Sequence, residues 1–174
     1  MRMIGFVALA GLLALAGCRS YSWRSGVPEN LRRVAVPVFR NEGGTTEFGN
    51  VVARQVLREF QREGTMRITS GADAALEVQG VVKRTHTGVM AHDRVTGLRN
   101  RGYRFSAKIE VTLVDRTTGK LIFNNRPYHA TTSYVGNDDE LTGERDASGR
   151  LAEDLARQIV DDVLAECGRK AGDK

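Results

Sequence analysis

The sequence contains few residues that could fix its structure covalently. Among its 174 residues are two cysteines, Cys18 and Cys167, three prolines and one tryptophan. Two cysteines allow one intrachain disulfide at most, so the fold has to depend on an ordinary hydrophobic core. The composition can supply that core, because 41% of the residues are hydrophobic and 27% are charged, as in globular rather than disordered chains.

Long hydrophobic runs are also missing. The run from Ile4 to Leu15 holds about 12 residues, whereas a membrane-spanning helix needs roughly 20. It follows a basic start at Arg2, and polar Arg19 and Ser20 come soon after it. A short apolar run behind a positive start, ending in small residues, is typical of a secretory signal peptide.

The segment Leu15-Ala16-Gly17-Cys18 resembles the bacterial lipobox, where the signal peptide is cut before a cysteine that receives a diacylglycerol and an N-acyl chain. Three acyl chains anchor far more firmly than one, which gives only marginal membrane binding. We therefore expect residues 1–17 to be a signal peptide and residues 18–31 to be a lipidated tether. An ordinary cleaved signal, or an uncut one, is the alternative. A lipidated Cys18 cannot form a disulfide, and Cys167 is expected to be a small buried apolar residue.

Positive charge is in modest excess, with a formal net charge of +5 and a pI near 9.6. Such a balance raises nucleic acid as a partner, but export from the cytoplasm argues against it. The abundant polyanions outside the cytoplasm are phospholipid headgroups and, in Gram-negative cells, the phosphorylated lipid A of lipopolysaccharide. A small net charge also favours solubility, so charge alone does not identify the partner.

Hydrophobic periodicity predicts four strands and two helices. Apolar residues alternate most strictly from Tyr103 to Leu113, which predicts one face on a core and the other, with Arg104 and Lys108, in a polar environment. The predicted strands span residues 33–39, 75–84, 103–113 and 121–134, and the predicted helices span residues 47–62 and 151–167.

These elements predict an α+β fold. The simplest arrangement that buries the apolar faces of these elements is a two-layer sandwich with two helices packed on one face of a four-stranded mixed sheet, in the chain order β-α-β-β-β-α. We expect one domain over residues 32–168 and a charged tail over residues 169–174.

Several details of this fold are specific enough to test. The first strand is expected to turn Val38 to the same side as Val34, and the last strand to turn Leu121 inward. A change of phase near Arg126-Pro127 indicates a bulge. Residues 136–149 are expected to form a polar loop.

The order and spacing of these elements resemble the lipopolysaccharide-assembly lipoprotein (LptE-like) family. The resemblance implies the same two-helix, four-stranded fold. It also implies a plug in the lumen of the LptD outer-membrane β-barrel, which helps to assemble the barrel and to deliver lipopolysaccharide to the cell surface. The matching segments are Val34-Ala35-Val36-Pro37-Val38-Phe39, Arg40-Asn41, the helix from Glu47, Ala72-Asp73-Ala74-Ala75-Leu76, Tyr103-Arg104-Phe105, Asp115-Arg116-Thr117-Thr118-Gly119-Lys120 and Leu151-Ala152-Glu153-Asp154-Leu155-Ala156.

The resemblance also bears on localisation. Arg19 and Ser20 stand where enterobacterial lipoproteins of the inner membrane carry the aspartate that retains them there. We therefore expect a lipid anchor in the outer membrane, with the domain facing the periplasm.

The best candidate binding segment is Gly88 to Arg104, a predicted loop between two strands. It contains Arg94, Arg99, Arg101 and Arg104, and clustered guanidinium groups suit phosphate because each can form bidentate charged hydrogen bonds. We expect these residues to contact lipid A phosphates or acidic groups in the barrel. A solvated hairpin loop with scattered charge is the alternative.

Other chemistries lack their motifs. His86, His92 and His129 have no further ligands at metal-binding spacing. Asp138-Asp139-Glu140 lacks the ordered spacing of an EF-hand, and no nucleophile elbow, Walker loop or dinucleotide fingerprint occurs. We therefore expect no metal, no cofactor besides the covalent lipid, and no catalysis. The alternatives are an accessory lipoprotein of another export system, for polysaccharide or a secretin, and an exported hydrolase with a site built from scattered residues.

Overall fold

The computed structural model describes residues 26–43, 47–92, 101–136 and 140–172, so the expected signal peptide and Cys18 lie outside the described residues. The helices are α2 (Phe48–Glu63) and α3 (Glu140–Gly172), with a short 3-10 helix at Glu29–Leu31. The strands are β1 (Arg33–Ala35), β2 (Arg40–Asn41), β3 (Arg67–Ile68), β4 (Leu76–His92), β5 (Arg101–Asp115) and β6 (Lys120–Gly136).

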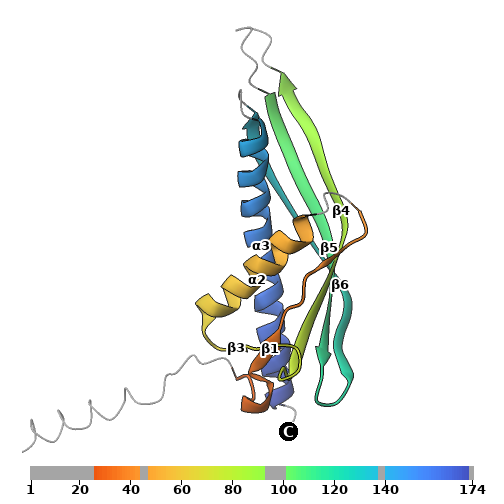
Figure 1. Ribbon diagram of the computed structural model, residues 1–174, viewed down its shortest axis with the longest axis vertical. Coiled ribbons are helices and arrows are strands. Elements are labelled where there is room, and N and C mark those ends of the chain that lie inside the picture. The colour runs from red at the N-terminus through yellow and green to blue at the C-terminus, as the bar shows by residue number, and fades with distance from the viewer. Residues whose placement is uncertain (1–25, 44–46, 93–100, 137–139, 173–174) are drawn as a thin grey trace, which may run out of the picture.

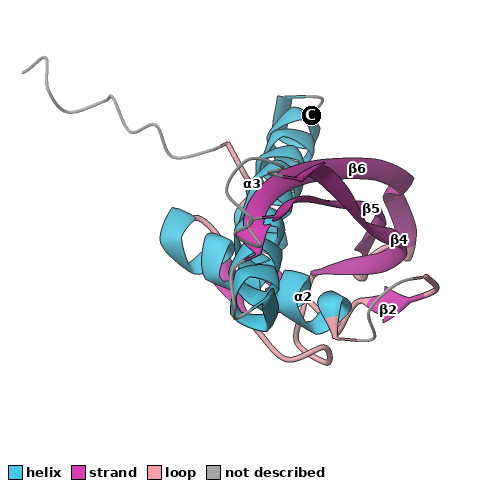
Figure 2. Cartoon of the chain, turned by 90° about the horizontal axis from the view of Figure 1, so that it is seen from above, coloured by secondary structure: helices cyan, strands magenta, loops and turns pink. Residues whose placement is uncertain are grey.

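The strands form one mixed sheet. Its order is β3-β1-β4-β5-β6, with β2 also paired to β4. β1 and β2 run parallel to β4, whereas β4, β5 and β6 are joined as antiparallel neighbours. Both helices pack on the same side of this sheet, as Figure 2 shows. Helix α3 follows the long strands, and α2 runs obliquely across α3 (Figure 1). The predicted two-layer α+β arrangement is thus confirmed.

The predicted number of strands was wrong, since the sheet has six and not four. The expected first strand divides into β1 and β2 around Pro37, which has no backbone N–H to donate to a ladder. The extended piece at Arg67–Ile68 adds β3 beside β1. The break also changes which side chains face the core, because Phe39 is buried at 2% exposure while Val38 is 67% exposed. The prediction for Val38 was therefore wrong.

The predicted bulge in the last strand is confirmed. Asn125 has a φ of 46°, and the pairing with β5 passes from Leu113↔Phe123 to Val111↔Arg126. Beyond it the buried positions change phase, so that Tyr128 enters the core. A second register shift, between Leu113 and Val114, leaves Leu121 53% exposed, which is why its predicted inward orientation was wrong.

Helix α2 matches its predicted stripe, with Phe48, Val52, Val56 and Phe60 all buried. It ends at Gly64, whose φ of 68° is the left-handed conformation that glycine adopts most easily.

Helix α3 begins at Glu140, so the polar loop predicted over residues 136–149 was wrong. Ala147 is fully buried and extends the four-residue apolar spacing of Leu151 by another turn. Gly143 also permits a close approach, because a Cβ there would lie 3.1 Å from the ring of Tyr134. No helix in the described part of the chain is both long and apolar enough to cross a membrane.

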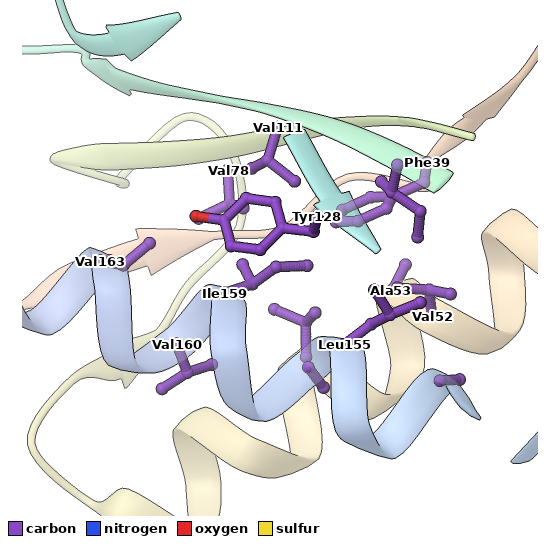
Figure 3. Packing of buried hydrophobic residues seen from close by; sticks show 14 of the residues in the cluster. Phe39, Val52, Ala53, Val78, Val111, Tyr128, Leu155, Ile159, Val160 and Val163 are labelled. Atoms are coloured by element: carbon purple, nitrogen blue, oxygen red, sulfur yellow. The ribbon is translucent and has the colours of Figure 1, made fainter. Parts of the chain in front are cut away.

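The core lies between the helices and the inner face of the sheet, as Figure 3 shows. Leu155, Ile159 and Val163 from α3 meet Val78 and Val111 from the sheet, and all five are fully buried.

The core extends along α3 as far as Cys167, which is also fully buried. Burial raises the pKa of its thiol to about 11, so the thiol stays protonated at neutral pH. Cys167 is therefore the buried apolar residue that was predicted.

Gly80 is required by the packing of Phe39. A Cβ at Gly80 would lie 2.1 Å from the Phe39 ring, which is itself buried. We expect Gly80→Ala to lower the free energy of unfolding by about 1–3 kcal/mol, as overpacking does. Gly149→Ala in α3 is the control, because nothing lies within 4 Å of its Cβ, and it should raise stability by roughly 0.5–1 kcal/mol. Urea unfolding followed by circular dichroism measures both, and equal effects of the two changes would contradict this account.

Candidate functional site

The candidate site lies on the outer face of the sheet, opposite the helices. In the half nearest β1, charged side chains on this face are paired. Arg116 binds Glu77, and Lys83 binds Glu42 and lies 3.9 Å from Glu110. The hydrogen bond from Lys83 lowers the pKa of Glu42, as expected for a carboxylate that accepts from a cation. This half of the face is charge-balanced.

The other half of the outer face carries positive charge, and none of its described residues is acidic. The registers of β4, β5 and β6 align its side chains in three rows across the strands. We call these the basic rows; they are Arg84-Lys108-His129, His86-Ser106-Thr131 and Gly88-Arg104-Ser133. The nearest acid along β5, Glu110, belongs to the next row.

The cations of the basic rows have no counter-charge among the residues that the structure describes. Among the described residues, no ion pair involves Arg84, Arg104 or Lys108. Arg84 and Lys108 stand directly opposite each other, where Cβ atoms are about 4.5–5.5 Å apart and like charges repel. An anion bound between them would relieve this repulsion.

Exposed apolar residues adjoin the basic rows at the far end of the strands. Val89 and Met90 on β4 are 54% and 50% exposed, and Val135 on β6 is 57% exposed. A surface hollow of about 420 Å³ joins the two kinds of side chain, since Val89, Met90, His86, Gly88 and Arg104 line it. Cationic and apolar groups side by side suit a ligand that has both a phosphate and hydrocarbon.

The predicted arginine cluster is only partly within the described residues. Arg104 is exposed on the outer face, as predicted. The backbone of Arg101 pairs with His92 and Gly136, whereas Arg94 and Arg99 lie outside the described residues.

The predicted loop over residues 88–104 was too long, because β4 continues to His92 and β5 begins at Arg101. Sequence reasoning also missed Arg84 as a site residue. A register shift between Val82 and Arg84 places it opposite Lys108, and no pattern in the sequence marked that bulge.

The basic rows do not resemble a hydrolytic site. Ser106 is the row neighbour of His86, but its Oγ donates to the backbone carbonyl of His86 at 3.4 Å. A nucleophilic serine would instead need to give its proton to an imidazole oriented by a third group. Within the described ranges, no group of three or more His, Cys, Asp or Glu side chains could hold a metal ion.

A second polar cluster joins α3 to β6. Arg126 binds Asp162 at 3.2 Å and Glu166 at 2.6 Å, and its guanidinium lies 4.2 Å from the centre of the Phe123 ring. The Tyr128 hydroxyl donates to Asp162 at 2.9 Å, and burial, followed by this bond, raises the pKa of the phenol. All its members are mutually paired, so the cluster fixes the helix on the sheet and offers no free group to a ligand.

The fold groups the chain with several solved bacterial structures. A protein from Xanthomonas campestris has a TM-score of 0.60 at 9% identity, covering 85% of this chain and 91% of that chain. An uncharacterised lipoprotein B from Nitrosomonas europaea has a TM-score of 0.50 at 13% identity, covering 83% of this chain and 86% of that chain. At such identities the likeness shows the fold alone. No curated protein matches the sequence.

The family follows from the sequence itself. Residues 31–163 match the family model described as LptE, lipopolysaccharide-assembly. Because the match covers most of the chain, the protein belongs to the lipopolysaccharide-assembly (LptE) family. The resemblance noted from the order of its segments is confirmed.

The α3–β6 cluster predicts a pH dependence of stability. Hydrogen bonds from Arg169 and then Arg126 lower the pKa of Glu166, so its stabilisation is present at neutral pH and is lost as pH falls through that lowered pKa. We expect Glu166→Gln to be less stable at pH 7 and to lose less stability than the parent between about pH 5 and pH 3. Urea unfolding across this pH range measures how steeply the free energy of unfolding changes with pH. Glu63→Gln, at an exposed position of α2, is the control, and identical slopes for all three proteins would refute the expectation.

Proposed function

We propose that this protein is an outer-membrane lipoprotein that works with an LptD-type β-barrel in lipopolysaccharide assembly. The observation that carries the proposal is the family match over residues 31–163. The role is one of binding and assembly, not catalysis. The chain is anchored through a lipid on Cys18, which keeps the folded domain at the inner surface of the outer membrane.

The basic rows support lipopolysaccharide as the ligand. Lipid A carries phosphates beside acyl chains, and the rows supply Arg84, Arg104 and Lys108 next to exposed Val89 and Val135. Guanidinium groups bind phosphate in bidentate fashion, and the strands hold their positions in fixed register. In this proposal Arg94, Arg99 and Arg101 also contact the lipid A phosphates.

The outer face also supports a barrel as the partner. Most of its exposed side chains along the three long strands are polar or charged, with Gln79, Lys108, Thr131 and Ser133 among them. The lumen of an outer-membrane barrel is likewise polar. A large polar interface of this kind excludes water because the two surfaces are complementary in shape and charge, and it does not need a large exposed apolar patch.

Lipidation is tested directly by Cys18→Ser. The parent protein, expressed in its host, should carry three acyl chains on a new N-terminal cysteine and fractionate with the outer membrane. The variant has no thiol for the thioether, so it should keep residues 1–17 or lose its outer-membrane localisation. Intact-mass spectrometry measures the modification, and membrane fractionation measures the localisation. An unmodified Cys18 in the parent would contradict the proposed lipid anchor.

Lipopolysaccharide binding is tested by reversing charge in the basic rows. The double change Arg104→Glu and Lys108→Glu should weaken binding of purified lipopolysaccharide by about tenfold or more at low salt. Added salt should reduce the difference in lipopolysaccharide affinity between parent and variant, because screening weakens exposed charge pairs. Arg58→Glu is the matched control, as Arg58 is an exposed cation on α2. If both variants lost affinity equally, or if neither lost affinity, the basic rows would not be the binding site for lipopolysaccharide.

The partner is tested by co-purification from the native host. An LptD-sized barrel should be captured with the lipoprotein, and depletion of the lipoprotein should reduce surface lipopolysaccharide and correctly folded barrel. Capture of a polysaccharide exporter or a secretin, with no barrel, would favour the alternative of an accessory lipoprotein for another export system.

A further inference from the structure

Three arginines line a surface hollow close to the point where the described chain begins. Arg32, Arg33 and Arg67 surround it together with Glu29 and residues 64–65, and its volume is about 420 Å³. All three arginine side chains are exposed. We call this site the arginine hollow. It lies at the end of the sheet where β4 starts, because β1 pairs with the first residues of β4 (Figure 1).

The backbone holds these arginines beside one another. Arg33 and Arg67 are direct neighbours on the parallel strands β1 and β3, and neighbouring strands are about 4.7–4.9 Å apart. The N–H of Arg67 also donates to the carbonyl of Arg32 at 2.7 Å. Like charges repel at such separations, so the fold keeps three guanidinium groups together against their mutual repulsion.

The positive charge of the arginine hollow is not neutralised by the residues that the structure describes. None of their ion pairs involves Arg32, Arg33 or Arg67, and Glu29, the one acid among the described lining residues, pairs with none of them. Residues 1–25 contain no aspartate or glutamate, so the preceding segment has no carboxylate side chain to offer. A bound anion would relieve the repulsion.

The donors of the arginine hollow suit phosphate. Arg32 uses its Nε–H on the carbonyl of Val27, at 3.3 Å, which leaves four of the five N–H donors of a guanidinium group for another acceptor. Guanidinium groups bind phosphate oxygens in bidentate fashion. The same bond fixes the start of the described chain beside the hollow, because Val27 is itself buried.

The course of the chain brings this end of the domain close to the proposed lipid anchor. Residues 19–26 connect Cys18 to the described domain, and a segment of this length spans at most about 29 Å even when fully extended. The basic rows lie farther away. Arg84 is about 26 Å farther along β4 than Leu76, which pairs with Val34.

We propose that the arginine hollow binds the phosphate groups of anionic phospholipid headgroups in the membrane that holds the lipid anchor. The inference rests on the proposed anchor at Cys18, because the anchor brings this end of the domain to a lipid surface. Three acyl chains already attach the protein firmly, so the contact orients the domain. It holds the end formed by β1 and β3 at the headgroups and keeps the basic rows away from them.

The test places the full lipidated chain on vesicles of phosphatidylcholine, with or without added phosphatidylglycerol as the anionic lipid. We expect hydrogen exchange over residues 29–33 and 65–68 to become about tenfold or more slower on the anionic vesicles. Exchange over residues 84–88 should stay unchanged, because screening limits the surface field to about 8 Å at physiological salt. High salt should remove the slowing at the hollow.

Charge reversal identifies the residues responsible. The double change Arg33→Glu and Arg67→Glu should abolish the slowing, whereas Arg58→Glu on α2 should preserve it. Both variants should unfold at the same urea concentration as the parent, because the changed side chains are exposed. Slowing that survives the double change would overturn the proposal.

Two further outcomes would also overturn the proposal. Equal slowing over residues 84–88 would show that the domain lies on its side on the membrane. Equal slowing at the hollow by inorganic phosphate, on vesicles of phosphatidylcholine alone, would show a site for free phosphate instead of a headgroup.

The anchor is measured separately, by flotation of the chain with phosphatidylcholine vesicles, which carry no net charge. A chain that does not float contradicts the lipid on Cys18. Its exchange is then measured with anionic vesicles in excess, where slowing over residues 29–33 still supports the arginine hollow and unchanged exchange overturns it. The two proposals can therefore fail independently.

Discussion

The whole molecule depends on the burial of one face of the three long strands. Phe105, Ile109 and Val111 of β5 are among its inward positions, and the helices α2 and α3 supply the apolar stripes that cover them. Burial of such side chains contributes roughly 1.5–3 kcal/mol each, so the helices are held to this side of the sheet. The period of two in a strand then commits the alternate residues to the opposite face. The outer face is therefore polar as a consequence of the core.

The bulges decide where on that outer face the charges meet. The shift between Val82 and Arg84 turns Arg84 outward beside Lys108, and the shift at Asn125 lets Tyr128 enter the core while His129 faces outward. Each bulge costs ladder hydrogen bonds but re-aims the residues that follow it. As a result, positive charge gathers in one half of the face, while the acids are paired in the other half.

The same arrangement separates the stabilising charges from those that are available to ligands. The Arg126 cluster binds α3 to β6 with every member paired. The basic rows have no such partners among the described residues, and repulsion between Arg84 and Lys108 makes them receptive to anions. This division gives the fold a stable body and leaves the cations of the basic rows exposed.

Much of the architecture could be predicted from periodicity. The stripes of α2 and α3, the alternation from Tyr103 to Leu113 and the phase change near Pro127 are local patterns, and each is present in the structure. The errors had local causes as well. Pro37 divided the first strand, and Ala147 extended α3 into a segment whose polar residues had suggested a loop.

The sequence by itself determined which side chains each long strand and helix must bury, because the spacing of apolar residues requires no knowledge of neighbours. Only the tertiary structure decided which strands lie beside one another and in which register. Arg84 and Lys108 are far apart in the chain. They lie opposite each other because the sheet packs cooperatively against both helices, and this packing selects the strand pairing.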